Sequence, residues 1–246
     1  MPHDCVMTAI TGVHYERLVA SGRSLHPGVR IGRPGRARTY WATIAAMRVL
    51  RLRWKVSVRG DENLPAGPAI LVGNHVSAMD PVAAVISHWW RVTAFTKAEV
   101  FGRRGAVFFR LMGQIPLRRG DEAATDWALQ MAAATLADGH KVGVYPEGTR
   151  SPDPHRLHRL HGRVLIPVIR DNPTAPVHAI HTAYPAASGW RRHIDIRLSA
   201  PLAIDRAGSD DDVISVVRDA LLALGGQEYL DESAARVKRR AAGLQA

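Results

Sequence analysis

Between residues 69 and 224 the sequence alternates between short apolar runs and segments with helical spacing, and this alternation most constrains the fold. A buried strand is expected at the apolar run 69–74, and further strands are expected at 91–96, 114–118, 141–145, 175–184 and 193–199. Helices are expected at 81–90, 98–112, 121–138 and 210–224. The clearest of these, 121–138, has acidic residues in its first turn, an alanine-rich body and Gly139 as a stop signal. Strands that alternate with helices predict a single α/β domain.

The two ends of the chain differ from this central part. Residues 1–38 are rich in Gly, Pro and Arg without periodicity, and we expect a basic, loosely ordered arm there. The segment 39–226 is the expected domain, and 227–246 is expected to form a C-terminal helix or tail. The stretch Tyr40–Val58 combines apolar residues at helical spacing with four basic residues, which predicts a basic amphipathic N-terminal helix. Such a helix suits a membrane interface, and it equally suits packing on the core with its arginines in water.

Charge limits the class of partner. The net charge is +11, and residues 1–60 hold eleven basic residues against only Asp4 and Glu16. A basic excess of this kind indicates an anionic partner (nucleic acid, an anionic membrane or a phosphorylated substrate), unless it serves only solubility. No apolar run approaches roughly 18 residues, so no transmembrane span is expected. Cys5 is the only cysteine, which excludes an intramolecular disulfide.

Two expected strands end in polar clusters. The run 69–73 leads into Asn74, His75, Ser77 and Asp80, and the run 141–145 leads into "PEGTRS" at 146–151. Ligand sites of α/β proteins gather at strand ends, so both clusters are candidate site residues. The alternatives are a core histidine at position 75, a helix cap at Asp80 before Pro81, and a Glu147–Arg150 pair that only stabilises a turn.

Taken together, the two clusters resemble those of the glycerolipid acyltransferases, the family of 1-acylglycerol-3-phosphate O-acyltransferase. That family carries an Asn-His, four-residue, Asp block and a later Pro-Glu-Gly-Thr-Arg block, and both stand here in order. Stretches at 62–77, 97–101, 112–121 and 175–179 extend the resemblance over roughly residues 40–205. Arg119 matches the arginine of the family's second block, with Arg118 where an acid is common. Departures are His161, where a lysine is common near Gly162, and an unusual Pro167.

The resemblance implies a mixed, mostly parallel sheet flanked by helices and the transfer of a fatty acyl group from a thioester to a hydroxyl. His75 would be the general base, and Asp80 would orient it and stabilise the imidazolium. Five positions along one regular helix would separate the two side chains by about 140°, so they must sit across a loop-to-helix turn. Ser77 is expected to be a local hydrogen-bonding residue rather than a nucleophile, and Asn74 and Pro146 to support the turns.

The same resemblance implies the substrates. The acceptor would be lysophosphatidic acid, with Arg119 on its phosphate and the acceptor site completed by Glu147, Gly148, Thr149 and Arg150. The donor would be acyl-CoA or acyl carrier protein, with no cofactor and no metal. The His155, His158 and His161 series is expected to be a surface face rather than a metal site. We expect a peripheral protein at the cytoplasmic face of the cell membrane.

Two alternatives stay open. The same chemistry could act on another lysolipid or an amino-lipid, because pocket shape decides the acceptor. A protein of another class, a non-catalytic membrane- or nucleic-acid-binding protein, would also explain the charge. The sequence lacks aromatic-rich RNA motifs and zinc spacing, so no nucleic-acid partner is expected.

Overall fold

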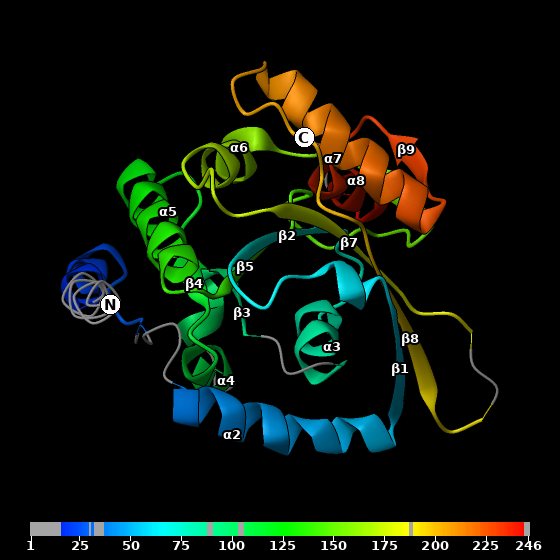
Figure 1. Cartoon of the computed structure of the whole chain (residues 1–246), viewed down its shortest axis with the longest axis horizontal. Coiled ribbons are helices and arrows are strands. Elements are labelled where there is room, and N and C mark those ends of the chain that lie inside the picture. Colours follow the sequence, from blue (N-terminus) through cyan, green and yellow to red (C-terminus); the bar gives the residue numbers. More distant parts are fainter. Residues whose placement is uncertain are drawn as a thin grey trace, which may run out of the picture.

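The computed structural model describes residues 16–29, 31, 37–87, 91–102, 106–186 and 189–243, and within them it has one main sheet (Figure 1). The strand order is β1 (Trp54–Arg59), β8 (Arg192–Leu198), β7 (Val177–Ala183), β2 (Ala69–Gly73), β5 (Lys141–Val144), β3 (Val92–Lys97) and β4 (Ile115–Leu117). Neighbouring strands run parallel except β7 and β8, which are antiparallel. The expected single α/β domain with a mixed, mostly parallel sheet is therefore confirmed.

Helices cover both faces of this sheet (Figure 1). One face packs against α5 (Glu122–Ala137), α6 (Gly162–Arg170) and α7 (Asp210–Gly225). The other packs against α2 (Ala37–Met47), α3 (Asp80–Ser87) and α4 (Ala106–Leu111). The central strand β2 is buried on both faces, with Ile70 and Val72 in the first core and Ala69 and Leu71 in the second. This explains why β2 is a continuous apolar run rather than an alternating one.

The longest helices begin and end where the sequence signals them. The Asp121 carboxylate accepts a hydrogen bond from the backbone N–H of Ala124 at 3.0 Å and caps α5. Ser209 and Asp212 form a capping box at the start of α7. Gly226, with φ of 63°, ends α7 in the left-handed conformation that glycine adopts without strain. Local chemistry therefore determined both ends of α7 and the start of α5.

The expected helix over Tyr40–Val58 is wrong beyond Met47. Helix α2 ends there, Arg48–Leu52 form a 3₁₀ helix (η1), and Trp54–Arg59 form the edge strand β1. The exposure of the side chains alternates along Trp54–Arg59, as expected for a strand: Trp54, Val56 and Val58 are less exposed than the charged or polar residues between them. Arg38 is the single basic residue in the sequence of α2, and the arginines at 48, 51 and 53 follow it.

The expected loosely ordered arm is also wrong in part. Residues 16–25 form a helix that packs on α5, and Leu18 and Val19 are buried. The indole N–H of Trp127 donates to the carbonyl of Leu18 at 2.7 Å. Gly22 permits this approach, because a Cβ there would lie 2.4 Å from the Trp127 ring. Residues 1–15, 30 and 32–36 lie outside the described residues, so the rest of the arm stays a prediction.

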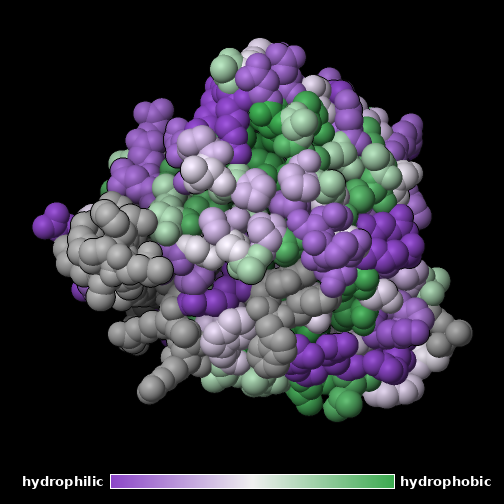
Figure 2. All heavy atoms as spheres, viewed as in Figure 1, coloured by the Kyte–Doolittle hydropathy of each residue, from purple (hydrophilic) through white to green (hydrophobic). Residues whose placement is uncertain are grey.

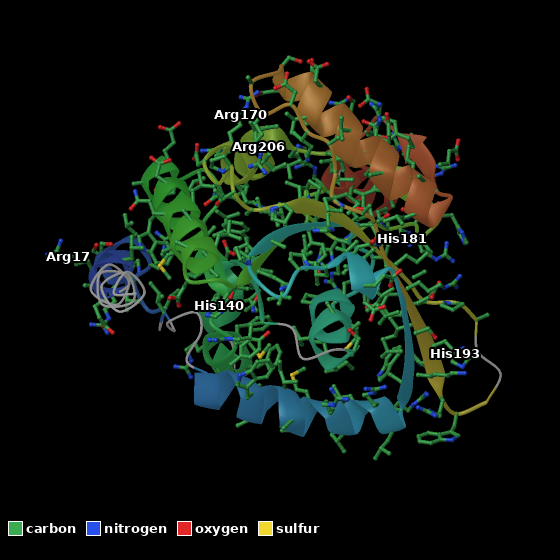
Figure 3. All side chains as sticks on the ribbon, in the orientation of Figure 1. Arg17, His140, Arg170, His181, His193 and Arg206 are labelled. Atoms are coloured by element: carbon green, nitrogen blue, oxygen red, sulfur yellow. The ribbon has the colours of Figure 1, made fainter. Side chains whose placement is uncertain are left out.

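Strands β6 (Arg156–His158) and β9 (Glu228–Leu230) were not foreseen, and they pair in parallel as a separate small sheet. Helix α6, which contains Pro167, was not foreseen either. After β9 the chain forms α8 (Ala234–Ala241), within the segment where a C-terminal helix or tail was expected. Arg170 and Arg206 lie together beside α6 (Figure 3), where both guanidinium groups donate to backbone carbonyls of the α6–α7 region. These contacts order loops that have little apolar sequence of their own.

The short helices η2 (Asp61–Asn63) and η3 (Ala98–Gly102) complete the described elements, and η3 covers part of the helix expected at 98–112. None of the helices in the described ranges is both long enough and apolar enough to cross a bilayer.

Candidate active site

The two polar clusters of the sequence meet at one edge of the sheet. Strands β2 and β5 are parallel neighbours, with Val72 opposite Val144, so the segments that follow them leave the sheet side by side. The backbone N–H of His75 donates to Oε1 of Glu147 at 2.9 Å. The backbone N–H of Ser151 donates to the carbonyl oxygen of His75. Hydrogen bonds therefore connect the two motifs directly, although they are about 70 residues apart in sequence.

His75 and Asp80 form a hydrogen-bonded pair across the turn from β2 into α3. Nδ1 of His75 lies 2.8 Å from Oδ2 of Asp80, which is 1% exposed. The same oxygen accepts the backbone N–H groups of Val76 and Ser77, each at 2.9 Å. Oδ1 accepts the hydroxyl of Tyr184 at 2.6 Å. Asp80 is also the first residue of α3, where the helix dipole favours a negative charge. Asp80 thus orders the turn before α3 and is the partner of His75, whereas no side-chain hydrogen bond from it to the first turn of the helix is present among the described contacts.

This arrangement leaves the other ring nitrogen of His75 available for chemistry. An aspartate that accepts from Nδ1–H selects the tautomer with a lone pair on Nε2. The imidazole stacks on the ring of Tyr145, with centroids 4.5 Å apart and 28° between the planes. The side chain is 19% exposed, so it is held firmly and still reachable. An oriented, partly exposed imidazole of this kind can remove a proton from a hydroxyl.

Three expected supporting residues lie beside the pair. Asn74 is buried, and its amide exchanges two hydrogen bonds with the backbone of Thr182, at 2.8 and 3.1 Å. These bonds continue the β2–β7 ladder by one position beyond Gly73. Ser77 Oγ accepts the backbone N–H of Met79 at 3.1 Å, which is a local contact in the turn. The carbonyl of Pro146 accepts the backbone N–H of His161 at 2.8 Å.

Glu147 lies inside the molecule rather than on the surface of the site. It is 1% exposed, and its second oxygen accepts the backbone N–H of His158 at 3.2 Å. Burial raises the pKa of Glu147 to about 7, against the opposing effect of the two backbone N–H donors. Because both oxygens bind backbone, Glu147 holds the loop of His75 to β6. The contact with a substrate hydroxyl that the sequence suggested for Glu147 stays a prediction.

The remaining motif residues lie around a basic surface. Gly148 has φ of 68°, and a Cβ there would lie 3.7 Å from a guanidinium nitrogen of Arg119, so Arg119 reaches the "PEGTR" turn. Thr149 is half-buried in that turn, and Arg150 follows it at the surface. In the described part of the chain neither Arg119 nor Arg150 has an ion-pair partner, so the alternative of a Glu147–Arg150 pair does not occur.

An apolar cavity of about 190 Å³ lies next to the His75–Asp80 turn. Its wall includes Ala78 and Pro81 from that turn and Tyr145, the ring that stacks on His75. The rest of the wall consists of Leu71, Gly73, Val82, Ala84, Val85, Val92, Ala94, Thr96, Phe108, Phe109, Met112, Gln114, Gly143 and Ile180. A histidine close to an apolar cavity and to exposed basic residues suits a substrate with both characters.

Four residues near the site were missed from sequence. Tyr145 and Tyr184 each follow the last residues of a strand, so the strand-end argument that found His75 could have found both. Lys97 is the last residue of β3 at the same edge. Lys238 lies on α8, and nothing in its local sequence links it to residues near position 150.

Among the described residues there is no group of three or more His, Cys, Asp or Glu side chains that could hold a metal ion. The expected surface face of His155, His158 and His161 is wrong, because His158 is fully buried while the other two are exposed. Strand β6 and its turn, rather than a helix, carry these residues.

Comparisons with known proteins agree with this geometry. The acyltransferase family model matches residues 55–177. A chloroplastic 1-acyl-sn-glycerol-3-phosphate acyltransferase of Arabidopsis thaliana is 28% identical over 61% of this chain and 42% of its own length. A 1-acyl-sn-glycerol-3-phosphate acyltransferase of Borreliella burgdorferi is 28% identical over 39% of this chain and 40% of its own. The chain thus spans about two fifths of the length of these curated relatives.

The fold has a solved counterpart. The crystal structure of the 1-acyl-sn-glycerophosphate acyltransferase PlsC of Thermotoga maritima aligns with a TM-score of 0.56 and 20% identity. The alignment covers 78% of this chain and 82% of that one. A likeness at this identity concerns the fold, whereas the family model covers half of the sequence and both motifs. The chain belongs to the acyltransferase family.

Proposed function

We propose that this protein transfers a fatty acyl group from acyl-CoA or acyl carrier protein to the free hydroxyl of 1-acyl-sn-glycerol-3-phosphate, which yields phosphatidic acid. One observation carries the proposal: the His75–Asp80 pair, joined at 2.8 Å, lies next to an apolar cavity that its own turn helps to line and next to the "PEGTR" turn, which carries the exposed Arg150. The first suits an acyl chain and the second a phosphate. The names of the curated relatives support this choice of acceptor.

His75 would act as the general base. Nε2 takes the proton of the acceptor hydroxyl while the hydroxyl oxygen bonds to the thioester carbonyl carbon. The tetrahedral intermediate then expels the thiolate of the donor, which leaves with the proton that His75 holds. Asp80 keeps the ring in the required tautomer and stabilises the imidazolium between the two steps. The acceptor attacks directly, so Ser77 is not needed as a nucleophile.

Basic residues at the site would hold the charged end of the acceptor. Arg119 and Arg150 are exposed and lack ion-pair partners among the described residues, so both are available for a phosphate. A guanidinium group binds phosphate through two parallel hydrogen bonds, which fixes orientation as well as position. Gly148 supports this role, because its φ of 68° gives the turn beside Arg119 a left-handed conformation that glycine adopts without strain.

The lipid substrates require access to a membrane, and the surface near α2 suits one. Val49 and Leu52 of η1, Val107 and Leu111 of α4 and Trp190 are exposed. Figure 2 shows hydrophobic spheres along this lower edge of the molecule, next to hydrophilic ones. Arg191 donates to the carbonyl of Arg51 at 2.8 Å, which places the loop of Trp190 beside η1. An apolar surface flanked by arginines suits peripheral binding to an anionic membrane, here proposed as its cytoplasmic face.

The test is an acyl-transfer assay with the purified protein, labelled acyl-CoA or acyl carrier protein, and a panel of lysolipids. We expect phosphatidic acid as the product, and we expect His75→Ala to reduce kcat by at least about a thousandfold. His193→Ala, in strand β8, is the matched control and should retain wild-type turnover. Normal turnover in a folded His75→Ala protein would refute the mechanism. Product formed only with another lysolipid would keep the chemistry and change the acceptor.

A further inference from the structure

The C-terminal segment is attached to the active-site motifs by backbone contacts. Strand β9 pairs with β6, and α8 follows β9 in the chain. The carbonyl of Glu232 lies 3.2 Å from both Nδ1 of His158 and the backbone nitrogen of Arg159. His158 in turn donates its backbone N–H to Glu147 of the "PEGTR" motif. The start of α8 is therefore two hydrogen bonds away from the residue that also binds the backbone of His75.

Lys238 differs from the other basic residues of α8. It follows Ala234 by four positions, so it lies on the same face of the helix, and Ala234 is fully buried. Lys238 is itself half-buried, whereas Arg236, Arg239 and Arg240 are exposed. Arg236 and Arg240 pair with Glu232. Lys238 thus faces the domain, while its neighbours face solvent.

The side chains near Lys238 come from the same edge of the sheet as the catalytic pair. Lys97 ends β3, and Arg150 follows the turn after β5. Both lie close enough for their charges to lower the pKa of Lys238, after the larger effect of burial, while Glu147 opposes them. None of these three cations has an ion-pair partner in the described ranges. Like charges held close together repel one another, and an anion that binds among them removes this cost.

We propose that Lys238 binds the phosphate of the lysolipid acceptor together with Lys97 and Arg150, and that α8 thereby completes the acceptor site. This proposal rests on the proposed function, since it assigns a residue to the acceptor of that reaction. A phosphate also occurs in acyl-CoA, so the shared chemistry is a phosphate group and the source has to be tested. The half-buried position of Lys238 favours the acceptor, whose phosphate must lie near His75.

The kinetic test compares Lys238→Ala with Arg239→Ala, which removes the same charge from the exposed side of the same helix. We expect Lys238→Ala to raise the KM for lysophosphatidic acid by about tenfold or more, with kcat nearly unchanged. The KM for acyl-CoA should stay the same. Arg239→Ala should leave both values within about twofold of the wild type, and Lys238→Arg should restore most of the affinity.

A second measurement tests phosphate binding by Lys238 independently of the proposed acyl transfer. Calorimetry with glycerol 3-phosphate measures binding of the phosphate group without turnover, and Lys238→Ala should weaken it by a similar factor. If Lys238→Ala binds glycerol 3-phosphate more weakly but the wild type transfers no acyl group, the proposed reaction is refuted and the anion site at Lys238 is supported. Equal effects of Lys238→Ala and Arg239→Ala would overturn the proposal, as would a change confined to acyl-CoA. Lys238→Met keeps the aliphatic stem and replaces the alanine variant if that fails to fold.

Discussion

At the scale of single residues, Glu147 combines two roles that conflict energetically. Its carboxylate accepts the backbone N–H groups of His75 and His158. The side chain is only 1% exposed, and burial raises its pKa to about 7. A group with a raised folded pKa stabilises the protein below its unfolded pKa, and that contribution is lost as the pH rises to the folded value. Burial of the charged form is therefore a cost at neutral pH that the geometry of the site requires.

Glu147→Gln tests this balance. The two backbone N–H groups bind different oxygens of Glu147, and glutamine replaces one of these oxygens by an NH2 donor. One buried N–H therefore loses its acceptor and the His75 loop shifts. We expect kcat/KM to fall by about 10- to 100-fold. The stability of the variant relative to the wild type should increase between about pH 4.5 and 7, because the variant lacks the titrating group. Activity assays and urea unfolding at several pH values measure both effects, and a variant with wild-type kcat/KM would contradict the positioning role.

At the scale of elements, the segment from α2 to β1 has two functions divided along its length. Tyr40 and Ile44 of α2 are buried in the second core, and Trp54–Arg59 form an edge strand of the sheet. Among the described residues of this segment, the large apolar side chains that are exposed, Val49 and Leu52, both lie in η1, and Leu52 is 65% exposed. Deletion of residues 1–58 would therefore remove most of a strand and part of a core together with the membrane surface. Point substitutions in η1 separate these effects.

We expect Leu52→Asp to weaken binding to vesicles that contain anionic lipid by about tenfold, since it places a charge on the apolar surface. Binding of the wild type should also weaken as salt concentration rises. Cosedimentation measures both. Gln130→Asp, at an exposed position of α5, adds the same charge elsewhere and should have little effect. Equal binding by Leu52→Asp and the wild type would mean that η1 is not the membrane contact.

At the scale of the whole molecule, buried histidines make stability depend on pH. His26 lies after the helix at 16–25, and His178 and His181 lie on β7; all three are buried, and burial lowers the pKa of each. Arg118 lowers the pKa of His26 further and Asp121 opposes this. A histidine with a lowered folded pKa contributes stability above its unfolded pKa of about 6.5, and that stability is lost as the pH falls toward the folded value. Glu147, whose pKa is raised, acts in the opposite direction, and we expect the three histidines together to set the sign of the net effect on acidification.

The melting temperature should consequently be several degrees lower at about pH 5.5 than at about pH 7.5. His26→Phe provides the control, because His26 lies against Trp127 at a centroid distance of 5.0 Å and both ring nitrogens lack hydrogen-bond partners in the described structure. The variant should show a smaller loss on acidification. Identical melting temperatures at the two pH values would contradict the role of the buried histidines.

Much of the fold was predictable, because local signals dominated where they were strong. A strand buried on both faces, such as β2, is a continuous apolar run in the sequence. The capping residues of α5 and α7 mark the ends of these helices. The errors fell where two periodicities compete. Trp54–Arg59 contains apolar residues that fit a helix and also alternate as in a strand, and only the neighbouring strand β8 decides between them.

The same division applies to the site. By itself the sequence determined the residues of both motifs, the side of the sheet on which they lie and the turn between His75 and Asp80, because these depend on local order and on strand direction. Only the tertiary structure decided that Tyr184 binds Asp80, that Glu147 faces backbone rather than solvent, and that Lys238 lies near Arg150. These contacts join positions about 70 to 100 residues apart, where packing rather than local propensity sets which side chains meet.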